Sequence, residues 1–376
     1  MPELYIGLMS GTSLDGIDAG LVDFSNNQCQ VIDFDFQPFD QTLKLRLAEI
    51  SQAENTVQLS QYGALDSELG LTFSKSIQAL LKKANILPEV IKAVGSHGVT
   101  THHSPNSPHP FSLQIGDPNI IAEITGITTI ADFRRRDLAA GGQGAPLVPA
   151  FHQYFFANDN EAVCVVNIGG IANITLLDSD SVLGFDTGPG NTLMDYWINK
   201  NHGLAYDKNG NWAKTGKVSV SLLEQLKQDK YFSLRPPKST GKEYFSPPWL
   251  ERHLTEFASL SPEDIQRTLC QLTADSICDA IQKHSRNKPK VLLCGGGCHN
   301  SLLFKLIEEE LKQPVFSTAE FGMHPDHVEA IAFAWLARQT INHLPGNMCT
   351  ATGARQPVIL GGIYPGGLVK QSGRKR

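Results

Sequence analysis

The stretch MSGTSLDGID, residues 9–18, decides the fold of this chain. It lies between two short apolar runs, residues 4–9 and 17–24, which indicate two β-strands joined by a loop. Its small residues allow consecutive backbone N–H groups to converge on an anion. No GK[ST] follows, and the next segment is a strand rather than a helix, so Walker A and dinucleotide-binding loops are excluded. Two interpretations of this stretch therefore remain, a phosphate-binding loop and a simple hairpin turn.

A second loop of the same kind lies about one domain length downstream. The sequence NIGGIAN, residues 167–173, again separates two apolar runs, 162–168 and 173–177. Two matched loops indicate a nucleotide held between two lobes. A third glycine-rich turn, residues 295–297, follows an apolar strand and precedes a helix, so it either faces a base or ribose or packs strand closely against helix.

Length and composition describe a folded protein of two domains. The chain has 376 residues, of which 41% are apolar and 19% are charged. A net charge of −6 and a basic cluster of only three residues, 134–136, predict no nucleic-acid partner. Glu3 and the short apolar stretch 4–9 make neither a signal peptide nor a membrane span, so we expect a cytoplasmic protein without a membrane partner.

Cysteine and histidine patterns bear on metal sites. Seven dispersed cysteines, an odd number, indicate reduced structural thiols, and Cys294 and Cys298 have the wrong spacing for a zinc knuckle. Four histidines, His97, His102, His103 and His109, lie close in sequence. The proline-rich segment around them offers no helix to hold ligands on one face, so solvated loop histidines are favoured over a metal centre.

Eight segments in a fixed order resemble a known family. They are MSGTSLDGID (9–18), GSHG (95–98), QIGD (114–117), DFRRRDLAAGGQGAPLVPAFH (132–152), NIGGIAN (167–173), GFDTGPGN (184–191), CGGG (294–297) and HPDHVEAIAFAWLA (324–337). Together they cover the chain nearly end to end. The ordered set closely resembles the anhydro-N-acetylmuramic acid kinases, within the superfamily of actin, heat-shock chaperone ATPases and sugar kinases.

This resemblance implies an α/β, two-lobed actin-like (ribonuclease H-like) ATPase fold with the nucleotide in the cleft between lobes. The first lobe would comprise residues 1–138 plus 326–376, and the second residues 139–325. The implied reaction uses ATP and Mg²⁺: water opens 1,6-anhydro-N-acetylmuramic acid while its 6-oxygen takes the γ-phosphoryl group. The product, N-acetylmuramic acid 6-phosphate, would feed peptidoglycan recycling.

The resemblance also assigns residues. Asp186 would be the base that activates water, since an ordinary carboxylate is ionised at neutral pH, and its alternative is a turn or cap ahead of a helix 191–200. Asp15 and Asp18 are the candidates to hold Mg²⁺ through water. The implied ATP-binding residues are Gly11, Thr12, Ser13, Leu14, Asp15, Gly16, Ile17, Asp18, Asn167, Gly169, Gly170, Gly295, Gly296 and Gly297.

Three residues would bind the sugar. Arg134 would hold its lactyl carboxylate by a two-pronged contact, with Arg135 and Arg136 solvated or ion-paired. His97 would lie on the substrate side. Glu329 would contact the sugar or, alternatively, form a helix-capping pair with Asp326.

Three alternatives from different classes remain. A regulatory actin-like ATPase would carry a partner-binding extension, a zinc hydrolase would bind stoichiometric zinc, and a kinase for ordinary hexosamines would need no lytic water. A monomer and a homodimer are both open.

Overall fold

The computed structural model describes residues 2–11, 13–51, 56–158, 161–178 and 181–367, so Thr12 lies outside the described residues. The chain divides into two units. Unit 1 consists of Met1–Ala139, Glu329–Gly346 and Val358–Arg376, and unit 2 of Ala140–Val328 and Asn347–Pro357.

The largest difference from the sequence-based division is a segment near the C-terminus, and smaller ones are residue 139, which belongs to unit 1, and residues 326–328, which belong to unit 2. Residues 347–357 belong to unit 2, although the predicted first lobe included everything after residue 325. Helix α13 (Cys349–Thr352) packs against the last long strand of unit 2, and the Arg355 N–H donates to the carbonyl of Ala140 at 3.0 Å. These local contacts hold the segment in unit 2. No pattern in the sequence predicts them.

The sheet of unit 1 has six strands in the order β13-β7-β4-β1-β2-β3. Strands β1, β2 and β3 form an antiparallel meander, of which the sequence predicts the first two strands, while β4 and β7 run parallel to β1. The strands are β1 (Leu4–Met9), β2 (Gly16–Asp23), β3 (Gln30–Pro38), β4 (Ile91–Ser96), β7 (Thr129–Ala131) and β13 (Gly362–Tyr364), and a separate hairpin pairs β5 (Val99–Ser104) with β6 (Phe111–Ile115).

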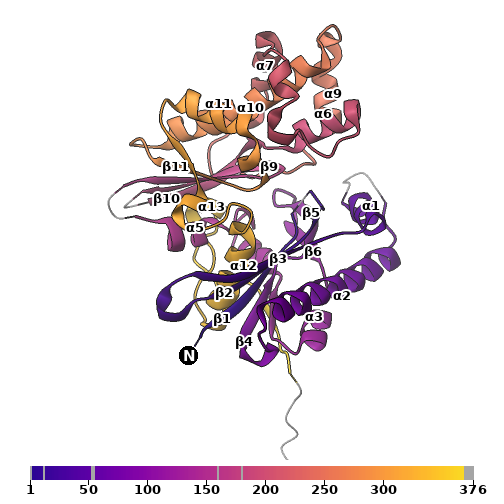
Figure 1. The fold of residues 1–376 in the computed structure, drawn as a ribbon, viewed down its shortest axis with the longest axis vertical. Helices are drawn as coiled ribbons and strands as arrows, with labels where there is room; N and C mark the ends of the chain where they lie inside the picture. Colours follow the sequence, from indigo (N-terminus) through magenta and orange to yellow (C-terminus); the bar gives the residue numbers. More distant parts are fainter. Residues whose placement is uncertain (1, 12, 52–55, 159–160, 179–180, 368–376) are drawn as a thin grey trace, which may run out of the picture. The chain divides into compact units, whose positions relative to one another are not determined.

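Helices cover this sheet. Those of unit 1 are α1 (Gln41–Ile50), α2 (Leu59–Ala84), α3 (Pro118–Thr125), α4 (Phe133–Ala139) and α12 (Val328–Ile341), with α2 and α3 side by side (Figure 1). Helix α12 lies directly on the sheet: a Cβ at Gly7 would overlap the Ala330 carbonyl, and one at Gly95 would overlap that of Phe333. Glycine in β1 and β4 thus permits this close approach.

The sheet of unit 2 has five strands in the order β10-β9-β8-β11-β12. They are β8 (Val163–Ile168), β9 (Ile171–Asp178), β10 (Ser181–Pro189), β11 (Lys290–Cys294) and β12 (Val315–Ser317). Three antiparallel strands are followed by two parallel ones, as in the core β3-β2-β1-β4-β7 of unit 1. Both units therefore share one ribonuclease H-like strand order, and the predicted fold class is confirmed.

Helix α10 is the longest helix of unit 2 and begins as its sequence indicates. Ser261 Oγ accepts from the Asp264 N–H and Pro262 occupies the first helical position. It packs on β9, β10 and α11 (Figure 1). The other helices are α5 (Pro149–Phe156), α6 (Thr192–His202), α7 (Val220–Lys227), α8 (Lys230–Ser233), α9 (Pro247–Leu254) and α11 (Ser301–Leu311).

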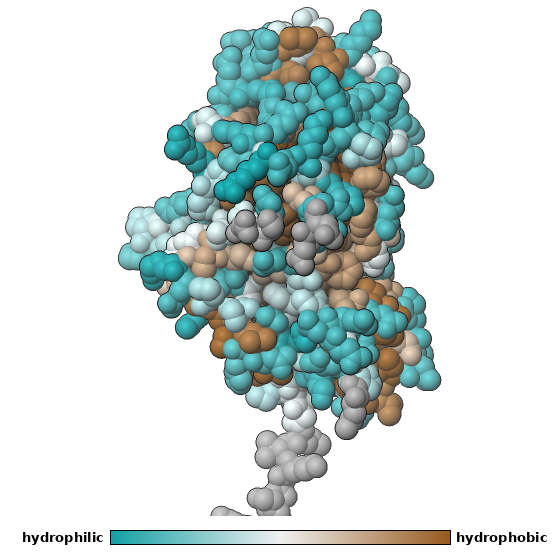
Figure 2. Space-filling view, turned by 90° about the vertical axis from the view of Figure 1, so that its left-hand side faces the viewer, coloured by the Kyte–Doolittle hydropathy of each residue, from teal (hydrophilic) through white to brown (hydrophobic). Residues whose placement is uncertain are grey.

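The surface is mainly hydrophilic on the face drawn in Figure 2, where hydrophobic residues form separate patches. Among the described residues no helix is both long and apolar enough to cross a bilayer. The seven cysteines are thiols rather than disulfides, as their dispersed pattern predicts.

Candidate active-site residues in the two units

Asp186 lies in β10, at a bulge in the pairing of this strand with β9. Its side chain is 7% exposed. Oδ2 accepts from the Thr240 N–H at 2.9 Å, the Asp186 N–H donates to the Lys238 carbonyl at 3.2 Å, and the Asp186 carbonyl accepts from the Tyr231 hydroxyl at 2.7 Å. Helix α6 begins six residues later, so the alternative of a helix cap is wrong. Asp186 is instead a buried carboxylate with a fixed orientation.

The three partners of Asp186 come from the segment 230–245, which we call the covering segment. Asp229 organises its start, because its carboxylate accepts from the Tyr231 N–H, the Tyr244 hydroxyl and the Trp249 indole. Burial opposes the charge of Asp229, but these hydrogen bonds hold its pKa below the ordinary value. Sequence patterns predict no functional role for this irregular, proline-rich stretch, because two of its contacts with Asp186 use backbone groups that have no side-chain signature.

The Gly169–Gly170 turn joins β8 to β9. Residues that follow Asp186 donate hydrogen bonds to this turn. The Gly190 N–H donates to the Gly170 carbonyl at 2.9 Å, and the Asn191 N–H donates to the Gly169 carbonyl at 2.8 Å. A Cβ at Gly169 would meet only the Ile171 carbonyl, at 3.5 Å. Since packing does not require glycine there, the open space suits a ligand.

The three glycines of the turn 295–297 have different environments, so close packing and contact with a ligand concern different residues of the turn. A Cβ at Gly295, where φ is +75°, would overlap Asn167 Oδ1, and one at Gly297 would overlap Ile168 Cγ2. A Cβ at Gly296 would find only Asn191 Nδ2, at 4.0 Å. The outer glycines serve close packing, and the middle one borders open space.

Asn167 is the second-last residue of β8, beside this turn, and is 5% exposed. Its Oδ1 has no hydrogen-bond partner among the described residues. A buried acceptor left unpaired costs about 1–3 kcal/mol, so a donor such as a hydroxyl or a metal-bound water would stabilise it. The open glycines and this acceptor fit a phosphate-bearing ligand with its hydrated cation.

In unit 1, the loop between β1 and β2 is anchored by Leu14. This residue is 3% exposed, has a φ of 55°, and donates its N–H to the Gly11 carbonyl at 3.1 Å. A Cβ at Gly11 would meet only Ser13 Oγ, at 3.9 Å, and the buried Ser10 Oγ has no partner among the described residues. The loop therefore combines an unusual fixed backbone with open space at Gly11.

Four other predicted residues follow Leu14. Gly16 and Ile17 lie in β2, where a Cβ at Gly16 would overlap the Gln37 carbonyl and Ile17 is fully buried. Asp15 is exposed and paired with Lys44 from α1, and Asp18 lies in β2 opposite Met9. No cluster of three His, Cys, Asp or Glu side chains able to hold a metal occurs in the part of the chain that the structure describes.

Arg134 and His97 are in direct contact. The guanidinium Nη2 and Nε lie 2.8 and 3.2 Å from His97 Nε2, and His97 Nδ1 lies 2.9 Å from the Gly98 carbonyl. Because a guanidinium only donates, Nε2 must accept and Nδ1 carries the proton. Burial, followed by the Arg134 charge, lowers the pKa of His97 well below its usual value. His97 is thus a neutral residue that orients Arg134.

The other sugar-binding candidates also have defined places. Arg135 pairs with Asp132 at 3.3 Å and Arg136 is exposed. Glu329 is in the first turn of α12, four residues before Phe333, whose ring lies 4.7 Å from that of His97. Helix α12 begins at Val328, and the Asp326 carboxylate bonds to His299 Nε2 at 2.9 Å.

The remaining histidines have separate environments, and His102 and His103 lie in β5 rather than in the expected loop. His102 stacks on Phe111 with a centroid distance of 5.2 Å, and His103 Nδ1 lies 3.0 Å from Ser112 Oγ. Burial lowers the pKa of His103 to about 4. The His109 carbonyl accepts from the Ser107 hydroxyl.

Comparison with known proteins identifies the family. Residues 3–366 match the sequence model described as anhydro-N-acetylmuramic acid kinase. A protein of that name from Pasteurella multocida is 50% identical over 364 residues, which are 96% of both chains. The one from Haemophilus influenzae is 48% identical over 377 residues, 97% of this chain and 98% of the relative. The one from Xylella fastidiosa is 47% identical over 367 residues, 96% of both chains. The predicted enzyme class, a kinase, is confirmed, and the chain belongs to the anhydro-N-acetylmuramic acid kinase family.

Proposed function

We propose that this kinase transfers the γ-phosphoryl group of ATP to the 6-oxygen of 1,6-anhydro-N-acetylmuramic acid while water opens the anhydro bridge. Water adds its oxygen to the anomeric carbon, the bond from that carbon to the 6-oxygen breaks, and the 6-oxygen takes the phosphoryl group. ADP and N-acetylmuramic acid 6-phosphate are the products. The family name of the relatives supports the sugar, and the clamped carboxylate of Asp186 is the structural observation that carries the proposal.

Asp186 is the proposed base. The Thr240 N–H holds one carboxylate oxygen, and the Tyr231 hydroxyl and the Lys238 carbonyl hold the backbone of Asp186 on either side. A base needs this fixed orientation, because proton transfer depends on hydrogen-bond distance to the water. The water's proton passes to the carboxylate as the new bond forms. Attack opposite the departing 6-oxygen inverts the anomeric centre.

The nucleotide would lie against Gly11 in unit 1 and against Gly169 and Gly296 in unit 2. At each of these three glycines a Cβ would meet no atom closer than 3.5 Å, so space for phosphates or ribose, rather than packing, explains the residue. Asp15 and Asp18 are the proposed Mg²⁺ residues, through water. Magnesium would neutralise charge on the phosphates when bound.

The sugar would be held by residues of unit 1. Arg134 is the proposed partner of the lactyl carboxylate, since guanidinium and carboxylate match in a two-pronged contact. His97 supports this role by fixing the guanidinium through Nε2, and Glu329 would accept hydrogen bonds from the sugar. With such a substrate the protein would act in the cytoplasm in peptidoglycan recycling.

A substrate panel tests this function. The protein with ATP and Mg²⁺ is given 1,6-anhydro-N-acetylmuramic acid, N-acetylmuramic acid, N-acetylglucosamine or no sugar, and ADP and sugar phosphate are quantified. We expect one ADP per N-acetylmuramic acid 6-phosphate with the anhydro sugar and slow ATP hydrolysis without sugar. Faster phosphorylation of an ordinary hexosamine would contradict the proposal and favour a simple hexosamine kinase.

A further inference from the structure

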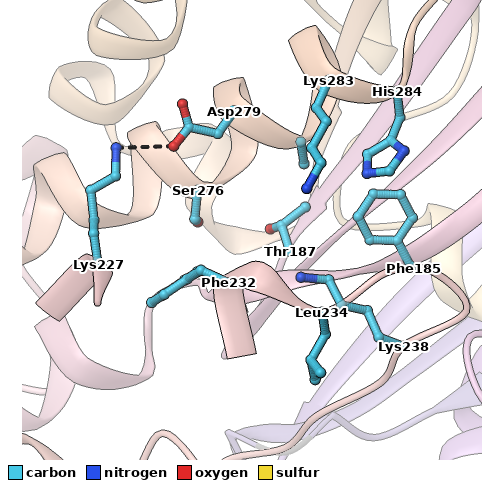
Figure 3. A pocket seen from close by; sticks show the side chains of 11 residues that line it. Phe185, Thr187, Lys227, Phe232, Leu234, Lys238, Ser276, Asp279, Lys283 and His284 are labelled. Carbon is cyan, nitrogen blue, oxygen red and sulfur yellow. Dashed lines mark ion pairs between the residues drawn. The ribbon is translucent and has the colours of Figure 1, made fainter. Parts of the chain in front are cut away.

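A pocket in unit 2 adjoins the strand that carries Asp186. Its cavity volume is about 60 Å³, it is open to solvent, and it lies between β10, α10 and the covering segment (Figure 3). Phe185 and Thr187, the two neighbours of Asp186 in β10, line it, whereas Asp186 does not. The proposed roles of Asp186, the glycines and Arg134 do not use this pocket.

Positive charge converges on the pocket from two elements. Lys238 comes from the covering segment and is 8% exposed, and Lys283 and His284 come from the last turn of α10. Figure 3 shows both lysine ammonium groups directed toward the space beside Thr187. Neither lysine forms an ion pair with any described residue, and Lys238 Nζ donates to the Tyr231 carbonyl at 3.1 Å.

The acidic residue on the pocket wall does not balance these charges. Asp279 pairs with Lys227 at 2.9 Å, and Lys227 also pairs with Asp275 at 3.0 Å. Burial, followed by the charge of Lys283, lowers the pKa of Lys238 to about 8 although Asp186 opposes the shift. Burial and the two lysines also lower the pKa of His284. An anion in the pocket would relieve this mutual repulsion.

We propose that this pocket is a binding site for a phosphate-class dianion, whose oxygens are held by Lys238 and Lys283 beside the His284 ring. Two converging ammonium groups suit a charge of two, and lysine is a common point-charge partner of phosphate. Inorganic phosphate and phosphomonoesters share this chemistry. Phe185 and Phe232 provide apolar walls for the organic part of a phosphomonoester.

Occupancy of the pocket would reach Asp186 through Lys238. The carbonyl of Lys238 accepts from the Asp186 N–H, and two residues later the Thr240 N–H donates to Asp186 Oδ2. A ligand that draws the Lys238 ammonium away from the Tyr231 carbonyl therefore acts on the segment that orients the carboxylate. This regulatory part of the inference rests on the proposed function of Asp186, whereas the binding part does not.

Direct binding to the full chain tests the site. Inorganic phosphate is titrated by calorimetry in the presence of saturating non-hydrolysable ATP analogue and Mg²⁺, so that nucleotide-site binding is blocked. We expect one bound phosphate per chain, weakened about tenfold or more by Lys283→Gln and also by Ala280→Trp, which fills the pocket but keeps its charges. Lys305→Gln, an exposed side chain of α11, is the matched control and should bind as the unmodified protein does.

Several outcomes would overturn the site. No saturable binding, or binding that survives both Lys283→Gln and Ala280→Trp, would show that the pocket takes no phosphate. Glycerol 3-phosphate provides the second arm: tighter binding than inorganic phosphate identifies a phosphomonoester as ligand, and weaker binding identifies the inorganic ion.

Turnover provides the regulatory readout. Phosphate should change kcat of the unmodified protein about threefold or more, and this change should be absent in Ala280→Trp. Binding without any change in kcat would overturn the link to Asp186 and leave the binding site intact. Failure of the proposed kinase reaction would leave the calorimetric result unaffected, so the two failures are distinguishable.

Discussion

The third strands of the two sheets, β3 and β10, have the same place in the same topology but very different environments. Each has nine residues and lies outside the first two strands of its meander. Every residue of β3 keeps part of its surface exposed, whereas β10 is buried from Gly184 to Pro189. Strand order alone therefore does not create the proposed catalytic position.

What differs is the chain that follows each strand. After β3 the chain forms α1 and α2, and Asp33 stays at the surface in an ion pair with Lys83 at 2.9 Å. After β10 it forms four helices and the covering segment, which closes over Asp186 with a backbone N–H, a carbonyl and a hydroxyl. The covering segment buries β10, and this strand can therefore hold a buried carboxylate, which the exposed strand β3 cannot.

The largest effect is expected from Asp186→Asn. Turnover should fall by about two to four orders of magnitude, the usual loss for a positioned base, while ATP and sugar still bind. Asp35→Asn, at the third strand of unit 1, is the control and should retain full turnover. Single-turnover rates and equilibrium binding should be measured on both variants. Asp186→Asn activity within about tenfold of the unmodified protein would contradict the assignment.

The next largest effects are expected from substitutions of glycines. They should differ between glycines that border open space and glycines that pack against other atoms. Gly169→Val and Gly11→Val should weaken nucleotide binding about a hundredfold and leave the unfolding free energy nearly unchanged, because both positions border open space. Gly297→Ala should instead destabilise the protein by about 1–3 kcal/mol, because its Cβ would overlap Ile168. Calorimetric nucleotide binding and urea unfolding separate the two effects. Unchanged nucleotide affinity in both valine variants would show that the two loops are simple turns and do not bind the nucleotide.

A smaller effect concerns the buried histidine of unit 2. His152 is fully buried with Nδ1 2.8 Å from Thr175 Oγ1, and burial lowers its pKa to about 3. The unfolded chain takes up the proton near pH 6.5, so this contribution to stability is complete above that pH and is lost as the pH falls toward 3.

Between pH 8 and pH 5 the loss from His152 should be about 2 kcal/mol. His152→Asn should lower stability at both pH values but remove this part of the pH dependence, as urea unfolding at the two pH values would show. His97 in unit 1 should cause a similar acid loss, since its pKa is also strongly lowered by burial and Arg134. An identical pH dependence in His152→Asn would show that the pKa of His152 is the same in the folded and the unfolded chain.

The smallest effect is expected from Tyr231→Phe, which deletes the hydroxyl that donates to the Asp186 carbonyl. Turnover should fall about threefold to tenfold, and the unfolding free energy by about 1 kcal/mol. Tyr244→Phe removes the hydroxyl bond to Asp229 in the same aromatic cluster and should lose similar stability with a smaller loss of turnover. Equal turnover losses in the two variants would show that the hydroxyl of Tyr231 does not position Asp186.

Much of the fold was predictable because its signals are local. The apolar runs predicted the first two strands of each meander, and Ser261 followed by Pro262 is typical of a helix start, as found at α10. Asp186 could be proposed from its motif, but its environment could not, because the Thr240 N–H and the Lys238 carbonyl are backbone groups 54 and 52 residues away. The contact of His97 with Arg134, and the different roles of Gly296 and Gly297, likewise depend on tertiary packing.

The most direct test of the account is where the oxygen of water ends up. The reaction is run with ATP, Mg²⁺ and 1,6-anhydro-N-acetylmuramic acid in oxygen-18 water, quenched early, and analysed by mass spectrometry beside product incubated in the same water to measure exchange. If Asp186 directs water to the anomeric carbon, one label beyond exchange lies on that carbon and the phosphoryl group has none. Label in the phosphoryl group, or an anomeric oxygen labelled only by exchange, would contradict the proposed role of Asp186.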